Sequence, residues 1–305
     1  MRKLPVWVVA SIFFCVNSLN AQFYYYNNKY YDNDIVVELG GSFGIMNAFT
    51  DLGGRKGVGK KFIKDLNWKN SKPAFGAYIM GVYRDAIGVR LQATFGQITA
   101  YDSILKDVKT TTYGRYERNL SFKSSIADFQ LAVEIHPLFF KSYDEGEAPF
   151  FSPYLVGGVG YFSFDPQAKL NGQWYSLHPL RTEGQGFKEY PDHKPYELNQ
   201  INFSAGIGVK YEINEFLNAR FEINHRFLTT DYLDDVSTTY IDPSLFSNYL
   251  PVNQAAIAQQ LYSRKAELTP GDITTPGSQR GNSKDNDAFF TIQLKVGVTL
   301  GRQRR

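Results

Sequence analysis

Residues 200–211 read QINFSAGIGVKY, and apolar and polar or small residues alternate along the whole segment. Ile201, Phe203 and Ile207 fall on one side of an extended strand. Asn202 and Lys210 fall on the other side. A period of two residues is typical of a β-strand with one apolar and one polar face. The segment is also long enough to cross a membrane at a tilt, which takes roughly 9–11 residues in a β-barrel.

The same alternation recurs along the rest of the chain. It is clear in residues 35–46, 87–98, 126–137, 217–227 and 288–300. It is weaker in two Gly-containing apolar segments, 74–83 and 153–164, for which the sequence leaves the facing of the side chains open. The pattern therefore predicts eight strands.

The gaps between these segments alternate in length. Short or medium joins fall at 84–86, near 141–149 and at 212–216; long ones fall at 47–73, 99–120, 165–198 and 229–287. Short periplasmic turns that alternate with long extracellular loops characterise outer-membrane barrels, which have an even number of strands. A soluble β-sandwich also has one polar and one apolar face per strand, but does not explain this alternation of loop lengths. We predict an all-β fold, an eight-stranded antiparallel transmembrane β-barrel with long extracellular loops.

The start of the chain predicts export. Arg2 and Lys3 precede an apolar run at 6–16, and a short polar stretch ends on Ala21. These are the three parts of a secretory signal peptide, and the run is too short to span a bilayer as a helix. We expect residues 1–21 to be cleaved and the mature chain to be a multi-pass protein of the bacterial outer membrane.

Composition is consistent with a barrel. Aromatic residues make up 16% of the chain, with 21 Tyr and 24 Phe, yet the mean hydropathy is only -0.33. The single cysteine, Cys15, lies in the predicted signal peptide, so the mature chain forms no disulfide bonds. Cleavage removes two of the three net positive charges. We therefore expect outer-membrane lipids as partners and no nucleic acid.

Three further regions complete the predicted organisation. Residues 22–34 form an aromatic N-terminal segment, and residues 35–305 form the barrel. The longest loop, 229–287, is extracellular in this arrangement. Within it, residues 252–268 are rich in Ala and Gln, follow a proline and precede Thr-Pro-Gly, which predicts one short helix.

The polar strand faces carry many charges that point into the predicted lumen. Eight strands enclose a space that side chains nearly fill, so these charges must be paired or hydrated. We predict an interior network of acids and bases with a structural role; a proton or ion path is the alternative. The predicted members are Glu38, Arg90, Asp128, Glu134, Lys210, Arg220, Glu222, Arg226 and Lys295.

Catalytic and metal-binding patterns are weak. His225 precedes Asp231 by six residues, but it has lipid-facing parity and no serine motif accompanies it. The acids in 231–235 lack the spacing of a calcium loop, and His178 and His193 have no ligand-like spacing. We predict no enzymatic activity, no metal and no cofactor, with an outer-membrane hydrolase as the least favoured alternative.

Two loop motifs resemble a known family. They are LRTEGQG at 180–186 and TDYLDDVST at 230–238, with supporting matches ELGG at 38–41 and SPYLVGGVG at 152–160. Together they resemble the PorG-like outer-membrane barrels of the type IX secretion and gliding machinery of Bacteroidota. The loop residues that carry the resemblance are Thr182, Glu183, Gly184, Gln185, Gly186, Thr230, Asp231, Tyr232, Asp234 and Asp235.

The resemblance implies a function that the composition does not show. Members of this family look like non-enzymatic components that help anchor a periplasmic ring, made of a lipoprotein and its partner, to the outer membrane. A generic structural or adhesive barrel is the alternative. The loop motifs fall on the extracellular side, so they either fold the loops or contact another outer-membrane component.

Overall fold

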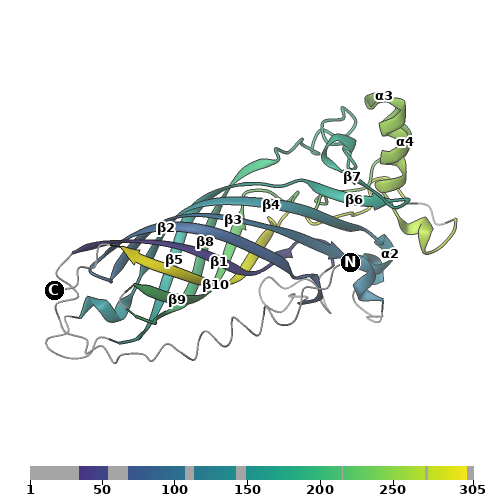
Figure 1. The fold of residues 1–305 in the computed structure, drawn as a ribbon. Coiled ribbons are helices and arrows are strands. Elements are labelled where there is room, and N and C mark those ends of the chain that lie inside the picture. The colour runs from purple at the N-terminus through teal and green to yellow at the C-terminus, as the bar shows by residue number, and fades with distance from the viewer. Residues whose placement is uncertain are drawn as a thin grey trace.

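A computed structural model describes residues 34–53, 68–106, 113–141, 149–214, 216–271 and 274–300 of the chain (Figure 1). The predicted signal peptide, residues 22–33 of the aromatic segment and the last five residues lie outside the described part.

Eight long strands form one closed antiparallel sheet, as the sequence predicts. The sheet order is β3-β2-β1-β10-β9-β8-β5-β4, and pairing of β3 with β4 closes the barrel. The barrel strands are β1 (Ile35–Phe49), β2 (Lys72–Tyr83), β3 (Ile87–Tyr101), β4 (Ser121–Ile135), β5 (Phe151–Ser163), β8 (Asn199–Glu212), β9 (Leu217–Leu228) and β10 (Ala288–Leu300).

The short turns lie at one end of the barrel and the long loops at the other (Figure 1). In barrels of this class the turns face the periplasm and the long loops face the cell exterior, and we name the two ends accordingly. Several strands extend further toward the exterior than predicted: β1 runs on to Phe49, β3 to Tyr101, and β4 begins at Ser121.

The third long loop contains a hairpin that the sequence analysis did not predict, β6 (Pro166–Leu170) and β7 (Gln173–Ser176). Asn171 and Gly172 form its turn, with φ angles of 49° and 87°. Asn-Gly is a favoured pair for two-residue hairpin turns, because both positions need positive φ. Strand β6 also pairs with the outer end of β4, so the hairpin continues the barrel wall.

The predicted helix at 252–268 is shorter in the structure, where α4 covers Val252–Leu261. The prediction was wrong for the last turns because Arg264 leaves helical backbone geometry, with φ of -120° and ψ of 16°. None of the described helices is long and apolar enough to cross a membrane. The other helical elements are η4 (Trp68–Asn70), η5 (Asp102–Leu105), α2 (Tyr113–Arg118), η6 (Pro137–Phe140), η7 (His178–Leu180), η8 (Pro243–Leu245), α3 (Phe246–Tyr249) and η9 (Lys265–Glu267).

The barrel is apolar outside and polar inside. On β4, Phe129 and Leu131 point outward and are 52% and 48% exposed, whereas Asp128 and Glu134 point inward and are fully buried. A soluble barrel has the opposite arrangement, because water rather than lipid surrounds it. This inversion is that of a transmembrane barrel.

The structure settles the facing of the two strands that the sequence left open. On β2, Phe75 and Ile79 are exposed on the outside, and Tyr78 is buried in the lumen. On β5, Leu155 is exposed on the outside, and Tyr154 is buried inside. Both strands therefore follow the same inside–outside alternation as the rest.

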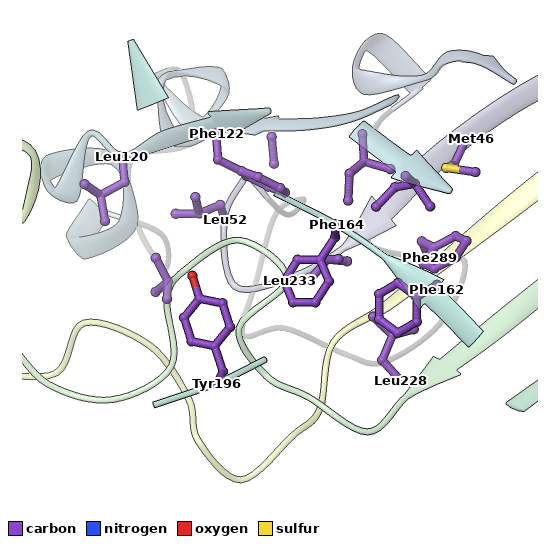
Figure 2. Close-up of a cluster of buried hydrophobic side chains, with 14 of the residues drawn as sticks. Met46, Leu52, Leu120, Phe122, Phe162, Phe164, Tyr196, Leu228, Leu233 and Phe289 are labelled. Carbon is purple, nitrogen blue, oxygen red and sulfur yellow. The ribbon is translucent and has the colours of Figure 1, made fainter. Parts of the chain in front are cut away.

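The long loops form a folded cap over the extracellular end. One apolar cluster joins strand residues such as Phe122 and Phe162 to the loop residues Leu52 and Leu233 (Figure 2). These side chains fill the outer end of the lumen. A second cluster packs the β6–β7 hairpin against α3 and α4, with Phe246 and other side chains at its centre. We use the term cap for the described parts of the four long loops.

The inverted polarity makes a first prediction. Leu131→Lys puts a charge at the middle of the lipid-facing side of β4 and should destabilise the folded barrel by about 2–4 kcal/mol. Ser125→Lys, on the same face above the apolar band, should cost less than about 1 kcal/mol. Urea titration in lipid vesicles, followed by the heat-modifiable gel mobility of the folded form, measures both. Equal costs for the two variants would contradict the assigned membrane position.

Candidate functional site

The lumen contains a chain of ion pairs centred on Arg90. Its guanidinium contacts Glu134 and makes two hydrogen bonds to Glu222, of 2.9 and 3.1 Å. Lys295 Nζ donates to Glu222 Oε1, which also accepts from Arg90, at 2.9 Å and to Gln92 at 2.7 Å. A forked guanidinium–carboxylate pair is stronger and more directional than a single hydrogen bond. This part of the network links β3, β4, β9 and β10 across the lumen.

The chain continues toward the periplasm through Arg220. Its guanidinium pairs with Glu38, with a second contact of 2.8 Å, and its Nε lies 3.7 Å from Glu134. The Tyr78 hydroxyl donates to Glu38 at 2.5 Å. The Tyr78 ring lies against Gly40, where a Cβ atom would come within 2.5 Å of it, and at Gly297 a Cβ atom would meet the Glu38 carboxylate and the Tyr78 hydroxyl. Glycine at these two positions makes room for the Tyr78 side chain and its carboxylate partner against the barrel wall.

Two smaller pairs flank this chain. Asp128 and Arg226 form an ion pair of 3.2 Å nearer the cap. Lys210 pairs with Glu212 at 2.9 Å and with Asp85 at 3.6 Å near the turns. All nine lumen residues named from the sequence lie inside the barrel and take part in these pairs. The sequence reasoning missed Asp85, in the turn between β2 and β3, and Glu212, at the end of β8, where alternation gives little information.

The network fills the lumen rather than lining an open passage. The side chains of Arg90, Glu134, Arg220 and Lys295 are at most 1% exposed. Above them, the apolar cluster of Figure 2 occupies the outer end of the barrel. An ion that moved through this space would have to separate buried pairs, which is costly. The geometry favours a structural role for these charges.

In the cap, the two family-like loop motifs bind each other. The carboxylate of Glu183 accepts hydrogen bonds from the backbone N–H groups of Ser237 and Thr238, at 3.0 and 2.9 Å, and from the Thr238 hydroxyl at 2.6 Å. Arg280 adds an ion pair of 2.9 Å to the same carboxylate. One residue of the first motif therefore fixes the backbone of the second.

Asp235 makes the reverse contact. Its carboxylate accepts hydrogen bonds from the Thr182 hydroxyl at 2.5 Å and the Tyr196 hydroxyl at 2.7 Å. Burial raises the pKa of Asp235 to about 6. Gly184 and Gly186 have φ angles of 68° and 80°, which glycine adopts without strain. The glycines of the motif thus shape the turn that presents its polar side chains to Asp235.

The position of the motifs bears on what they do. Thr182, Glu183, Asp234 and Asp235 are fully buried, and Tyr232 stacks on Tyr196 with ring centroids 4.8 Å apart. The other motif residues also lie within the folded cap: Gly184, Gln185, Gly186, Thr230 and Asp231. Their contacts fold the two loops together, and the most buried of them are inaccessible to a partner.

The cap also buries a group of carboxyl groups without enough bases. The nearby Arg118 and Arg280 pair with Asp102 and Glu183. The remaining carboxyl groups repel one another instead, and this repulsion raises pKa values within the group. They are Asp51, Asp231, Asp234 and Asp287. We call these four residues the acid cluster.

Their pKa values reflect this shortage. Burial raises the pKa of Asp231 to about 9 and that of Asp234 to about 8, and the Asp51 carboxylate adds to both shifts. Burial raises the pKa of Asp287 well above its ordinary value. Among the described residues, no three His, Cys, Asp or Glu side chains are placed to hold a metal ion. The raised pKa values shift Asp231 and Asp234 toward the protonated form at neutral pH.

The histidines have packing and hydrogen-bonding roles. His225 lies on the outward side of β9 against the rings of Phe49 and Phe227, with centroids 5.6 and 4.5 Å away. In the cap, His193 Nδ1 lies 2.5 Å from the Glu183 carbonyl oxygen, and His178 Nε2 lies 2.9 Å from that of Tyr196. This placement gives no support for a hydrolytic site at His225.

Comparisons with known proteins find resemblance among solved structures alone. The sequence matches no known protein family and no curated protein. Solved structures that resemble it include the outer membrane protein OprG from Pseudomonas aeruginosa, with 12% identity over 87% of this chain and 95% of the other, at a TM-score of 0.39. Neisserial surface protein A has 9% identity, 87% and 97% coverage, and a TM-score of 0.35. The attachment invasion locus protein of Yersinia pestis has 8% identity, the same coverages and a TM-score of 0.33.

The lumen network makes a second prediction. Glu222→Gln removes the negative charge that Arg90 and Lys295 share, and should destabilise the barrel by about 3–5 kcal/mol, since it leaves buried cations uncompensated. Ser204→Ala is the matched control: this lumen hydroxyl is buried and has no hydrogen-bond partner among the described residues, so its loss should change stability by less than about 0.5 kcal/mol. Urea unfolding measures both. A near-neutral Glu222→Gln would show that the network contributes little.

The acid cluster makes a pH prediction. Folding raises the Asp231 and Asp234 pKa values from about 3.9 to about 9 and 8, so the folded cap binds more protons than the unfolded one. The resulting stabilisation is complete below about pH 4 and is lost as the pH rises toward 9. We expect the cap to be more stable at pH 6 than at pH 9.5, measured by urea titration of Trp174 fluorescence in a Trp68→Phe background.

The control for this experiment is a pair of variants. Asp231→Asn with Asp234→Asn should make the pH dependence shallower, because the amides do not titrate. Asp192→Asn, an exposed acid elsewhere in the cap, should leave it unchanged. An equally steep dependence in all three proteins would contradict the assignment to the acid cluster.

Proposed function

We propose that this chain is a non-enzymatic outer-membrane barrel of the type IX secretion and gliding machinery, and that it helps anchor a periplasmic ring to the outer membrane. The observation that carries the proposal is the mutual binding of the two family-like motifs, in which Glu183 holds the backbone of Ser237 and Thr238. The residues on which the resemblance rests thus form one connected unit.

The filled lumen supports an anchoring role. The ion-pair chain around Arg90 and the apolar cluster above it occupy the barrel interior, so transport through this barrel is not the activity that its geometry favours. A barrel without an open passage acts through its ends. The outer membrane is the proposed location because the outside of the barrel is apolar and the predicted signal peptide directs export.

The periplasmic end offers a surface for the proposed ring. Phe140 in η6 is 62% exposed, and Ile213 and Phe216, in the turn between β8 and β9, are 49% and 48% exposed. Exposed apolar side chains on turns suit contact with a protein or with the lipid interface. We propose that the ring lipoprotein and its partner bind at this end.

A structural or adhesive barrel is the second candidate. The observation that favours it is the cap, which has an apolar core of its own around Phe246, Ala258 and Leu261. A folded cap outside the membrane is a surface that other cells or molecules can meet. This function does not require the periplasmic turns.

The two candidates separate in a strain that lacks the chain. The proposed function predicts that the periplasmic ring is lost from the outer-membrane fraction and that secretion fails, and that the wild-type chain restores both. Phe140→Ser with Phe216→Ser should restore at least tenfold less ring. Trp68→Ser, an equally drastic change of an exposed aromatic residue at the extracellular end, should restore it fully.

Other results decide against the proposal. Ring retention and secretion that are normal in the deletion strain would rule out the anchoring role. If adhesion is lost at the same time, the second candidate is favoured. Restoration by the double variant at the wild-type level would move the proposed contact away from these turns.

A further inference from the structure

The outward face of β4 continues past the edge of the lipid-facing band. Phe129 is the outermost large apolar residue on this face, and its ring meets Phe95 of β3 at 5.9 Å in an edge-to-face pair. Ser125 and Lys123 follow on the same side of the strand. Six residues separate the two, so at about 3.4 Å per residue Lys123 lies roughly 20 Å further along the strand than Phe129, outside the apolar band and on the side of the outer-leaflet headgroups.

The β6–β7 hairpin widens this face. Lys123 is paired with Gln167 of β6, and Lys169 of β6 is paired with Trp174 of β7. Directly opposed residues in an antiparallel pair point to the same side, so all four side chains share the outward side of the wall. The opposite side of β6 is buried, because Ala168 packs in the second apolar cluster of the cap. Figure 1 shows β6 and β7 against the outer end of β4.

Two ammonium groups gather around one aromatic ring at this place. Lys123 Nζ lies 3.9 Å from the centroid of the Trp174 ring, and Lys169 Nζ lies 6.0 Å from it. Cation–π attraction holds Lys123 in position without neutralising its charge. Among the described residues, neither lysine forms an ion pair. Asp165 at the base of the hairpin accepts hydrogen bonds from Gln167 and Ser176 instead.

We propose that Lys123, Lys169 and Trp174 form a binding site for the phosphate-bearing headgroup of an outer-leaflet lipid. Each ammonium group has three donors, and the phosphate oxygens are acceptors. The indole ring, which is 36% exposed, adds an apolar surface beside the two ammonium groups. A lipid is the source that the position favours, because the site continues the lipid-facing side of β4. The site is separate from the proposed ring contact at the periplasmic end.

The test uses the full-length mature barrel in zwitterionic detergent, with Trp68→Phe so that Trp174 is the one tryptophan beyond residue 21. Phosphatidic acid is the probe, phosphatidylcholine the neutral comparison, and inorganic phosphate the free-anion comparison. Native mass spectrometry counts bound lipid, and Trp174 fluorescence follows binding at the ring. We expect phosphatidic acid to bind and change the emission, and the other two to do neither at the same concentration.

Lys123→Gln with Lys169→Gln should weaken the binding of phosphatidic acid by roughly ten- to thirtyfold, since each lysine near an anionic lipid contributes about 1 kcal/mol. Lys188→Gln with Lys194→Gln removes two exposed lysines elsewhere in the cap and should leave binding unchanged. Heat-modifiable gel mobility verifies that both variants fold. Equal binding by all three proteins, or equal loss in both double variants, would overturn the site. An equal response to inorganic phosphate would overturn its assignment to a lipid.

Discussion

The pairing of charges inside the barrel is the constraint on which the rest of the structure depends. A barrel in a bilayer must turn its apolar side chains outward, so its polar side chains are left with the lumen. With eight strands the lumen is too narrow to hydrate them freely. The chain from Glu38 through Arg220, Glu134, Arg90 and Glu222 to Lys295 alternates acid and base at each step. The strand register brings these acids and bases together, and the glycines beside Tyr78 leave room for its side chain.

The cap meets the same constraint in a different way. Its interior contains more carboxyl groups than arginines, so Asp102 and Glu183 receive the cationic partners. Asp234 accepts hydrogen bonds from the backbone N–H groups of Leu52 and Val236. Its raised pKa favours the protonated carboxyl group. The barrel is therefore balanced by fixed charges and the cap by backbone donors and protons. We therefore expect the stability of the cap to depend on the pH of its surroundings.

The sequence predicts the barrel well because alternation is a local property. A residue two positions from Phe129 on the same strand faces lipid, regardless of the sequence elsewhere in the chain. The charged residues between these positions face inward. The cap is not predictable in this way. The partners of Glu183 are backbone groups 54 and 55 residues away. No periodic pattern in the sequence indicates such a contact. The β6–β7 hairpin is an intermediate case: Asn171-Gly172 is a recognisable turn signal, but pairing with β4 depends on where the barrel wall ends.

The distribution of charges over the strands has a consequence for how the barrel assembles. Glu38 is on the first strand, Lys295 on the last, and their partners Arg220 and Glu222 are both on β9. While the sheet is still open, these charges lack their partners and a lipid environment penalises them. They become balanced together when β10 joins β1 and β9. We expect closure to be cooperative, because a sheet that pairs out of register leaves these charges without partners in its interior.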